Sequence, residues 1–181
     1  KMYGPMGIGG LYGKAYWLEK MQPYQLGGEM IDKVTFAKTT YNEIPYKFEA
    51  GTPNVADVMG LGAAIDYLQA LGWDFIKAQE TDLLHYATSR LMEIEGIQII
   101  GTSAHKAAII SFLMEGIHFF DAGTILDHMG IAVRTGNHCT QPLMDFLGIN
   151  GTLRASMAFY NTRQEIDRLV EGIYQVKTLF A

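Results

Sequence analysis

Hydrophobic residues recur with a helical period in two consecutive segments, residues 54–72 and 74–95. Asn54, a residue type that often begins helices, stands at the start of the first segment, and Gly96 ends the second. The pattern predicts two consecutive helices. Their stripes are formed by Val55, Val58, Met59, Leu61, Gly62, Ile65 and Leu68, and then by Ile76, Leu83, Ala87, Leu91 and Ile94.

After Gly96 the helical period gives way to short apolar runs, which are typical of strands. Near the C-terminal end, Thr162 and Glu165 have the spacing of a capping box and begin a closing amphipathic helix. These alternating elements predict an α+β domain. The expected strands are residues 97–100, 108–113 and 131–134, with a helix over residues 121–129 between the last two.

The first fifty residues show little periodicity. A glycine-rich turn leads into a short apolar run at residues 8–12, which predicts a strand. Residues 25–53 contain turn-forming glycines and prolines, so we expect a long loop with short extended pieces. The change of pattern along the chain predicts two domains, residues 1–75 and 76–181.

Composition narrows the class of protein. With 181 residues, 49% apolar and 18% charged, the chain is expected to fold as a soluble protein. A net charge of -5 and the absence of a basic cluster argue against a nucleic-acid partner. No apolar stretch approaches the roughly 20 residues that span a bilayer. The chain begins at Lys1 without Met and without a signal peptide, so we expect it to be cut from a longer polypeptide.

Cys139 is the one cysteine of the chain, which excludes an internal disulfide and favours a reducing, cytoplasmic location. A solitary cysteine is often a small buried hydrophobe. Here it stands between His138 and Thr140 in a polar segment that begins at Arg134, directly after a predicted strand. This setting is typical of an exposed thiol whose thiolate form is favoured by positive charge.

The residues disfavour three other types of site. A catalytic dyad of His138 and Cys139 is disfavoured because neighbouring residues project in different directions. These two residues are also too few for a metal site, and no other histidine has ligand spacing, so no metal is expected. The Gly7-Ile8-Gly9 segment begins like a dinucleotide-binding loop, but Tyr12 stands where the third glycine belongs.

Arg154 lies in an apolar, strand-like segment, Leu153 to Ala158. A charge in such surroundings is costly unless it is paired. Arg154 therefore forms a structural ion pair or binds an anionic ligand such as a carboxylate, and its residue type suits both.

Four motifs follow one another along the chain. They are Lys1-Met2-Tyr3-Gly4-Pro5-Met6-Gly7-Ile8-Gly9, Phe48-Glu49-Ala50-Gly51-Thr52-Pro53-Asn54, Arg134-Thr135-Gly136-Asn137-His138-Cys139, and Leu153-Arg154-Ala155-Ser156 with Tyr160-Asn161-Thr162. Their order and spacing resemble the SufS/CsdA type of cysteine desulfurase, group II of the NifS-like enzymes in the class V aminotransferases. The resemblance covers essentially the whole chain and corresponds to the C-terminal part of such an enzyme.

The resemblance implies an α/β fold, that of the fold-type-I pyridoxal-phosphate (PLP) dependent transferases. Residues 1–75 would be the C-terminal part of the large α/β domain that binds PLP, and residues 76–181 the small α+β domain. Lys1 matches the lysine that carries the cofactor, and Thr52 matches the residue that reaches the cofactor phosphate of the neighbouring subunit in a homodimer.

The other site residues also follow from the resemblance. Cys139 matches the nucleophile and Arg154 the arginine that binds the substrate carboxylate. Arg134, His138 and Asn137 are expected to complete the substrate site. Two residues depart from the pattern, because this branch commonly has His in place of Asn137 and Ala in place of Thr140.

The implied reaction converts L-cysteine to L-alanine and leaves a persulfide on Cys139, whose sulfur passes to a SufE/SufU-like acceptor for iron-sulfur cluster assembly. A selenocysteine lyase or a cysteine-sulfinate-acting relative would share these motifs. A different class, a non-catalytic docking module for sulfur-transfer proteins, also remains open on the sequence alone.

Overall fold

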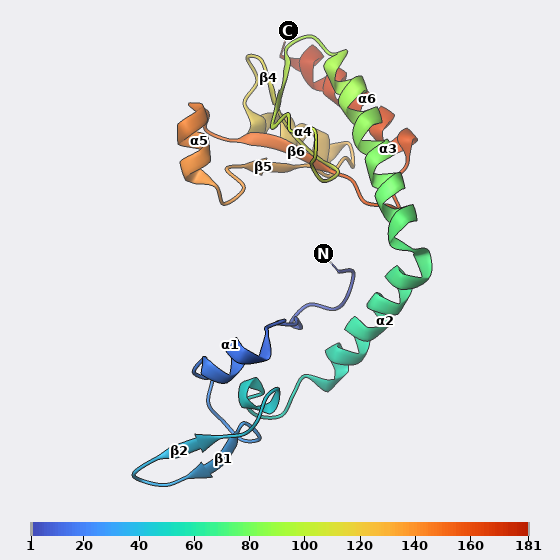
Figure 1. Ribbon diagram of the computed structural model, residues 1–181. Helices are drawn as coiled ribbons and strands as arrows, with labels where there is room; N and C mark the ends of the chain where they lie inside the picture. The colour runs from blue at the N-terminus through green and yellow to red at the C-terminus, as the bar shows by residue number, and fades with distance from the viewer. Residues whose placement is uncertain (1, 181) are drawn as a thin grey trace. The chain divides into compact units, whose positions relative to one another are not determined.

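The computed structural model describes residues 2–180. The chain divides into two compact units, unit 1 with residues 1–71 and unit 2 with residues 72–181. This division falls between Leu71 and Gly72, at the junction of two helices. Figure 1 shows the elements of each unit.

Unit 1 contains two helices, a hairpin and a turn of 3-10 helix. The predicted strand at residues 8–12 is wrong, because these residues form no regular element. A strand gains stability only from a paired neighbour, and the adjacent glycines raise the entropic cost of ordering it. The elements are α1 (Ala15–Lys20), β1 (Ile31–Val34), β2 (Thr39–Tyr41), η1 (Tyr46–Phe48) and α2 (Val55–Leu71).

The start of α2 lies where the sequence predicts it. Asn54 directly precedes the helix, and its Oδ1 accepts a hydrogen bond of 3.3 Å from the backbone N–H of Asp57. This bond satisfies one of the N–H groups that the first helical turn leaves without a partner. At the other end, Gly72 has a φ of 84°, which favours glycine and ends the helix.

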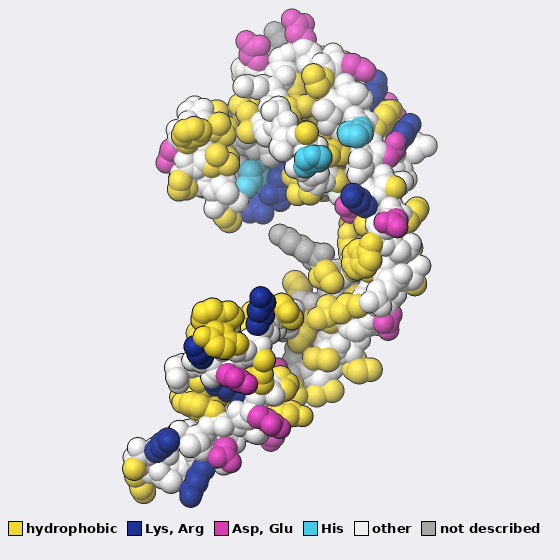
Figure 2. Space-filling view, in the orientation of Figure 1, with side chains coloured by type: hydrophobic (Ala, Val, Ile, Leu, Met, Phe, Trp, Pro, Cys, Tyr) yellow, Lys and Arg dark blue, Asp and Glu magenta, His cyan; other side chains and the backbone are white. Residues whose placement is uncertain are grey.

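Unit 1 buries few of its apolar side chains. Met30 and Leu68 are the fully buried hydrophobic residues in its described part. Along α2, Val55 and Met59 are exposed, and hydrophobic side chains gather over α1 and α2 (Figure 2). An apolar surface of this kind is typical of an interface.

Unit 2 is a four-stranded antiparallel sheet with helices against it (Figure 1). The strand order is β3-β4-β6-β5, so the last two strands lie beside each other in reverse chain order. The elements are α3 (Trp73–Met92), β3 (Ile97–Ile100), β4 (Ile109–Met114), α4 (Phe119–His128), β5 (Arg134–Gly136), α5 (Gln141–Leu147), β6 (Thr152–Ser156) and α6 (Arg163–Leu179).

Most of the expected elements of unit 2 are present. The strand predicted over residues 131–134 is displaced, because the ladder to β6 begins only at Arg134. Apolar residues Ile131 and Val133 pack against the core from the preceding loop, which explains why their pattern resembled a strand. The short helix α5 was not predicted, since seven residues give too little periodicity.

The core lies between one face of the sheet and helices α3, α4 and α6. Strand β4 alternates strictly, with Ile110, Phe112 and Met114 buried. The capping box at Thr162 is present, and α6 then buries a continuous stripe. That stripe consists of Ile166, Leu169, Val170, Ile173 and Val176.

Helix α4 lies unusually close to strand β5. A Cβ added to Gly123 would stand 2.3 Å from Cγ2 of Thr135, which real atoms do not tolerate. The close packing of α4 against Thr135 thus limits how far β5 can move toward the helix. Arg134 is next to Thr135, so its position is restrained as well.

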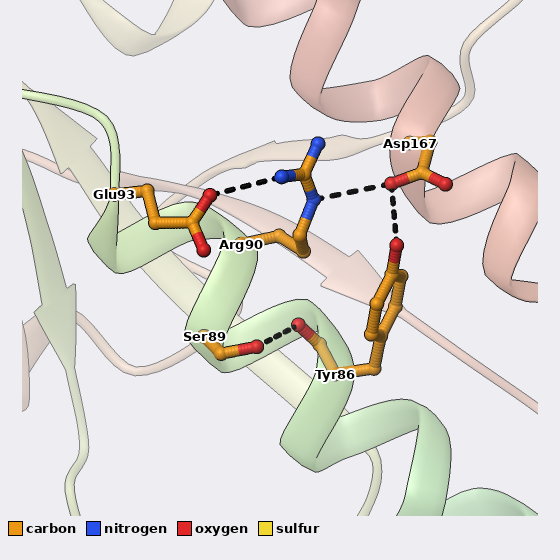
Figure 3. Close-up of polar contacts among 5 residues, drawn as sticks. All are labelled: Tyr86, Ser89, Arg90, Glu93 and Asp167. Carbon is orange, nitrogen blue, oxygen red and sulfur yellow. Dashed lines mark hydrogen bonds and ion pairs between the residues drawn. The ribbon is translucent and has the colours of Figure 1, made fainter.

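A polar network joins α3 to α6 at the surface (Figure 3). Oδ1 of Asp167 accepts hydrogen bonds from the Tyr86 hydroxyl at 2.7 Å and from Nε of Arg90 at 3.1 Å. Arg90 also reaches Glu93 at 2.9 Å. Donation to Asp167 raises the pKa of Tyr86, so its hydroxyl stays protonated and keeps the bond.

We expect Ile173→Ala to lower the free energy of unfolding of unit 2 by about 2–5 kcal/mol, because Ile173 is fully buried and its loss leaves a cavity. The matched control is Leu179→Ala on the same helix, whose side chain is 67% exposed and should cost less than about 0.5 kcal/mol. Urea unfolding followed by circular dichroism measures both. If both variants lowered the free energy of unfolding equally, Ile173 would not belong to the core.

Candidate active site

Two arginines face each other across the β5–β6 pair. Arg134 is the direct partner of Arg154 in the antiparallel ladder, so both side chains project on the same face of the sheet. Like charges at directly opposed positions are destabilising. Among residues 2–180, neither arginine forms an ion pair with a carboxylate.

Arg154 has a donor that lacks a partner. Its Nε is buried and makes no hydrogen bond in the structure. Leaving such a group unpaired is costly, and a bidentate anion would satisfy it. Of the two readings that the sequence left open, the structural ion pair therefore loses support, and an anionic ligand is favoured.

Cys139 lies in the turn after β5, and it is exposed. Nη2 of Arg134 stands 3.8 Å from its Sγ, within the distance of a hydrogen bond to sulfur. A guanidinium at that distance stabilises a negatively charged sulfur. The sequence placed these two residues in one segment, and the structure brings their side chains together.

His138 points from the same turn toward β6. Its Nε2 lies 2.9 Å from Oγ1 of Thr152, a fully buried residue, whereas its Nδ1 is buried without a partner. Burial, and then the positive charges of Arg154 and Arg134, lower the pKa of His138. The ring is therefore neutral at pH 7, and it ties the turn to the sheet without adding a third charge.

Asn137 lies in the turn as well, and its side chain contacts the turn itself. Oδ1 accepts from the backbone N–H of Cys139 at 3.2 Å, and Nδ2 donates to Oε1 of Gln141 at 2.9 Å. Both ends of the Asn137 amide thus already have hydrogen-bond partners, and its place in the substrate site stays a prediction.

The remaining predicted residues belong to unit 1. Thr52 is exposed, and it follows Gly51, whose φ is 82° and whose N–H donates to the carbonyl of Gly28 at 2.9 Å. Asn54, not Thr52, caps α2, so the Thr52 hydroxyl is not used to start the helix. Lys1 lies outside the described residues.

Sequence reasoning missed Thr152. It is buried and stands opposite Gly136 in the ladder, which is what lets its hydroxyl reach His138. Only the strand register reveals that proximity, because fourteen residues separate the two in the chain.

No group of three metal-ligating side chains lies together within residues 2–180. In the same range, no helix is long and apolar enough to cross a membrane.

The chain is similar to known protein families and to cysteine desulfurases of other organisms. The aminotransferase class-V model matches residues 1–169. The chain belongs to this family. It is 47% identical to a probable cysteine desulfurase of Xylella fastidiosa over 99% of its length, but it spans only 43% of that protein.

Solved structures of cysteine desulfurases are also similar to this chain. A crystal structure of the cysteine desulfurase CsdA from Escherichia coli matches with a TM-score of 0.92 and 40% identity, covering 98% of this chain and 44% of that one. An apo cysteine desulfurase from Thermococcus onnurineus gives a TM-score of 0.92 at 37% identity, covering 97% of this chain and 44% of that one. The predicted fold class, the C-terminal part of a fold-type-I transferase, is confirmed.

We expect His138 to make the stability of unit 2 depend on pH. Because its pKa is lowered on folding, its contribution is full above the unfolded value of about 6.5 and is lost as the pH falls through the folded value. The urea midpoint should therefore drop between pH 7 and pH 5. In His138→Gln, this drop should be smaller, with His128→Gln on α4 as control. An unchanged drop in His138→Gln would contradict the assignment.

Proposed function

We propose that the full-length protein is a PLP-dependent cysteine desulfurase. The observation that carries the proposal is the geometry of unit 2, where Arg134 lies opposite Arg154 and also reaches Sγ of Cys139 at 3.8 Å. A carboxylate held by this arginine pair would stand beside a nucleophilic sulfur. Membership of the aminotransferase class-V family and the similarity to cysteine desulfurases support the same reaction.

The described residues fit such a substrate and its cofactor. The unpartnered Nε of Arg154 suits the carboxylate of L-cysteine. In unit 1, the exposed hydroxyl of Thr52 is free of any capping role and suits a phosphate oxygen, while Lys1 would hold the cofactor. When bound, PLP would supply an electron sink for electrons released at the substrate carbons.

The chain's own residues would do the remaining work. Arg154 would orient L-cysteine through its carboxylate, and the Lys1 amine would move the α-proton. The thiolate of Cys139, with Arg134 beside it, would attack the substrate sulfur, so that an S–S bond forms and the Cβ–S bond breaks. The substrate Cβ keeps the electron pair of that bond and takes up a proton. L-Cysteine and the Cys139 thiol thus give L-alanine and a Cys139 persulfide, and the transfer needs no external oxidant.

Partners follow from this assignment. The persulfide would pass to a SufE/SufU-like acceptor and serve iron-sulfur cluster assembly in the cytoplasm. The exposed apolar surface of α2 supports burial against other parts of a homodimer, in which Thr52 would reach the partner's cofactor phosphate. L-Selenocysteine is a second substrate of the same chemistry.

Replacing the nucleophile tests the reaction. Cys139→Ala in the full-length protein should lower sulfide release from L-cysteine at least about a hundredfold, because the sulfur loses its acceptor. The absorption band of the bound cofactor should persist, since Cys139 is exposed and its loss leaves no core cavity. Thr178→Ala, which removes a hydroxyl from the far end of α6, is the control. Turnover retained in Cys139→Ala refutes the role.

Replacing Arg154 tests the carboxylate site. A charge-assisted hydrogen bond is worth about 1.5–3 kcal/mol, so Arg154→Ala should raise the KM for L-cysteine about tenfold to a hundredfold. Arg154→Lys should recover part of the loss, because an ammonium lacks the planar fork. Arg90→Ala, in the α3–α6 network, should leave KM unchanged. If Arg154→Ala unfolds unit 2 instead, the residue is structural.

A further inference from the structure

The turn that carries Cys139 has an unfavourable backbone. His138 and Cys139 follow each other with φ values of 54° and 64°. Residues with a Cβ rarely occupy this left-handed region, and two in succession are rarer still. A turn of this shape persists only where surrounding contacts hold it.

Asn137 provides those contacts from both its backbone and its side chain. Its Oδ1 accepts from the N–H of Cys139 at 3.2 Å, and its carbonyl accepts from the N–H of Thr140 at 2.9 Å and from Oγ1 of Thr140 at 2.7 Å. Asparagine is well suited to this task because its short amide bonds to backbone two residues on. Asn137 and Thr140, which flank His138 and Cys139 in the chain, are thus hydrogen-bonded to each other.

The turn is also anchored to helix α5. Nδ2 of Asn137 donates to Oε1 of Gln141 at 2.9 Å, and Nε2 of Gln141 donates to Oδ1 of Asp145 at 2.8 Å. Met144, on the same helix, is buried. These side-chain hydrogen bonds therefore connect the strained turn to α5, whose Met144 is buried.

We propose that Asn137 is a positioning residue that holds Cys139 for sulfur transfer, with Thr140 as its second support. The inference rests on the proposed function and changes the role expected from the sequence, where Asn137 was a substrate-binding residue. Oδ1 of Asn137 is engaged by the turn and Nδ2 by the first residue of α5, and Cys139 Sγ stays near Arg134 only while the turn keeps its shape. The two departures from the family pattern, Asn137 and Thr140, are the two residues that close the turn.

Two readouts on the full-length protein test the proposal. Steady-state kinetics with L-cysteine separates kcat from KM, and amide hydrogen exchange of the peptide with residues 137–144 reports the turn and the start of α5. Asn137→Ala should lower kcat about tenfold or more, because a displaced nucleophile loses its alignment, and leave KM within about twofold. Exchange in the peptide should become faster by a similar factor.

Matched variants isolate the effect. Asn42→Ala removes a similar side-chain-to-backbone hydrogen bond in unit 1, where Oδ1 of Asn42 accepts from the N–H of Glu43 at 2.9 Å. This variant should change neither readout. Asn137→Asp keeps the acceptor for Cys139 but loses the donor to Gln141, so its exchange rate should fall between those of the wild type and Asn137→Ala. Thr140→Ala should shift kcat and exchange in the same direction by about twofold to threefold, and it replaces Asn137→Ala if that variant does not fold.

The outcomes are distinct. A raised KM with unchanged exchange would make Asn137 a substrate-binding residue and overturn the proposal. So would a fall in kcat without faster exchange, or no change in either readout. If the wild-type protein lacks desulfurase activity, the proposed function fails, and the exchange arm alone decides whether Asn137 holds the turn.

Discussion

The antiparallel pairing of β5 with β6 sets the positions of Arg134, Arg154 and Thr152 in unit 2. It places Arg134 opposite Arg154, and Gly136 opposite Thr152. The first pair creates a concentration of positive charge, and the second brings a buried hydroxyl within reach of His138. Helix α4 stabilises the β5–β6 pair, because Gly123 lets the helix lie directly against Thr135 of β5. A slip of one residue in this register would turn the arginines to opposite faces.

The electrostatics of the site follow from that pairing. Two guanidinium groups without a carboxylate partner are a standing cost to the folded chain, and an anionic ligand relieves it. The same charges lower the pKa of His138, which keeps the ring neutral and prevents a third positive charge at the turn. The positive charge at this position favours bound anionic groups.

The position of Cys139 depends on a small set of local hydrogen bonds. Strand pairing carries the chain only as far as Gly136, and beyond it the turn is held by side-chain hydrogen bonds of Asn137, Thr140 and His138. Strand pairing therefore positions the arginines, whereas side-chain hydrogen bonds position the sulfur. In the proposed reaction, the residues that bind the substrate and the residue that accepts the sulfur are thus held by different kinds of interaction.

The sequence alone determined the long helices, the α+β character of unit 2 and the segment that carries Cys139, because periodicity and capping residues are local signals. The start of α2 after Asn54 and the capping box at Thr162 are examples. The strand predicted at residues 8–12 failed because pairing is not a local property. Whether Arg154 had an acidic partner, and that Thr152 lies beside His138, were decided only by the tertiary structure, since strand register brings together residues that lie far apart in the chain.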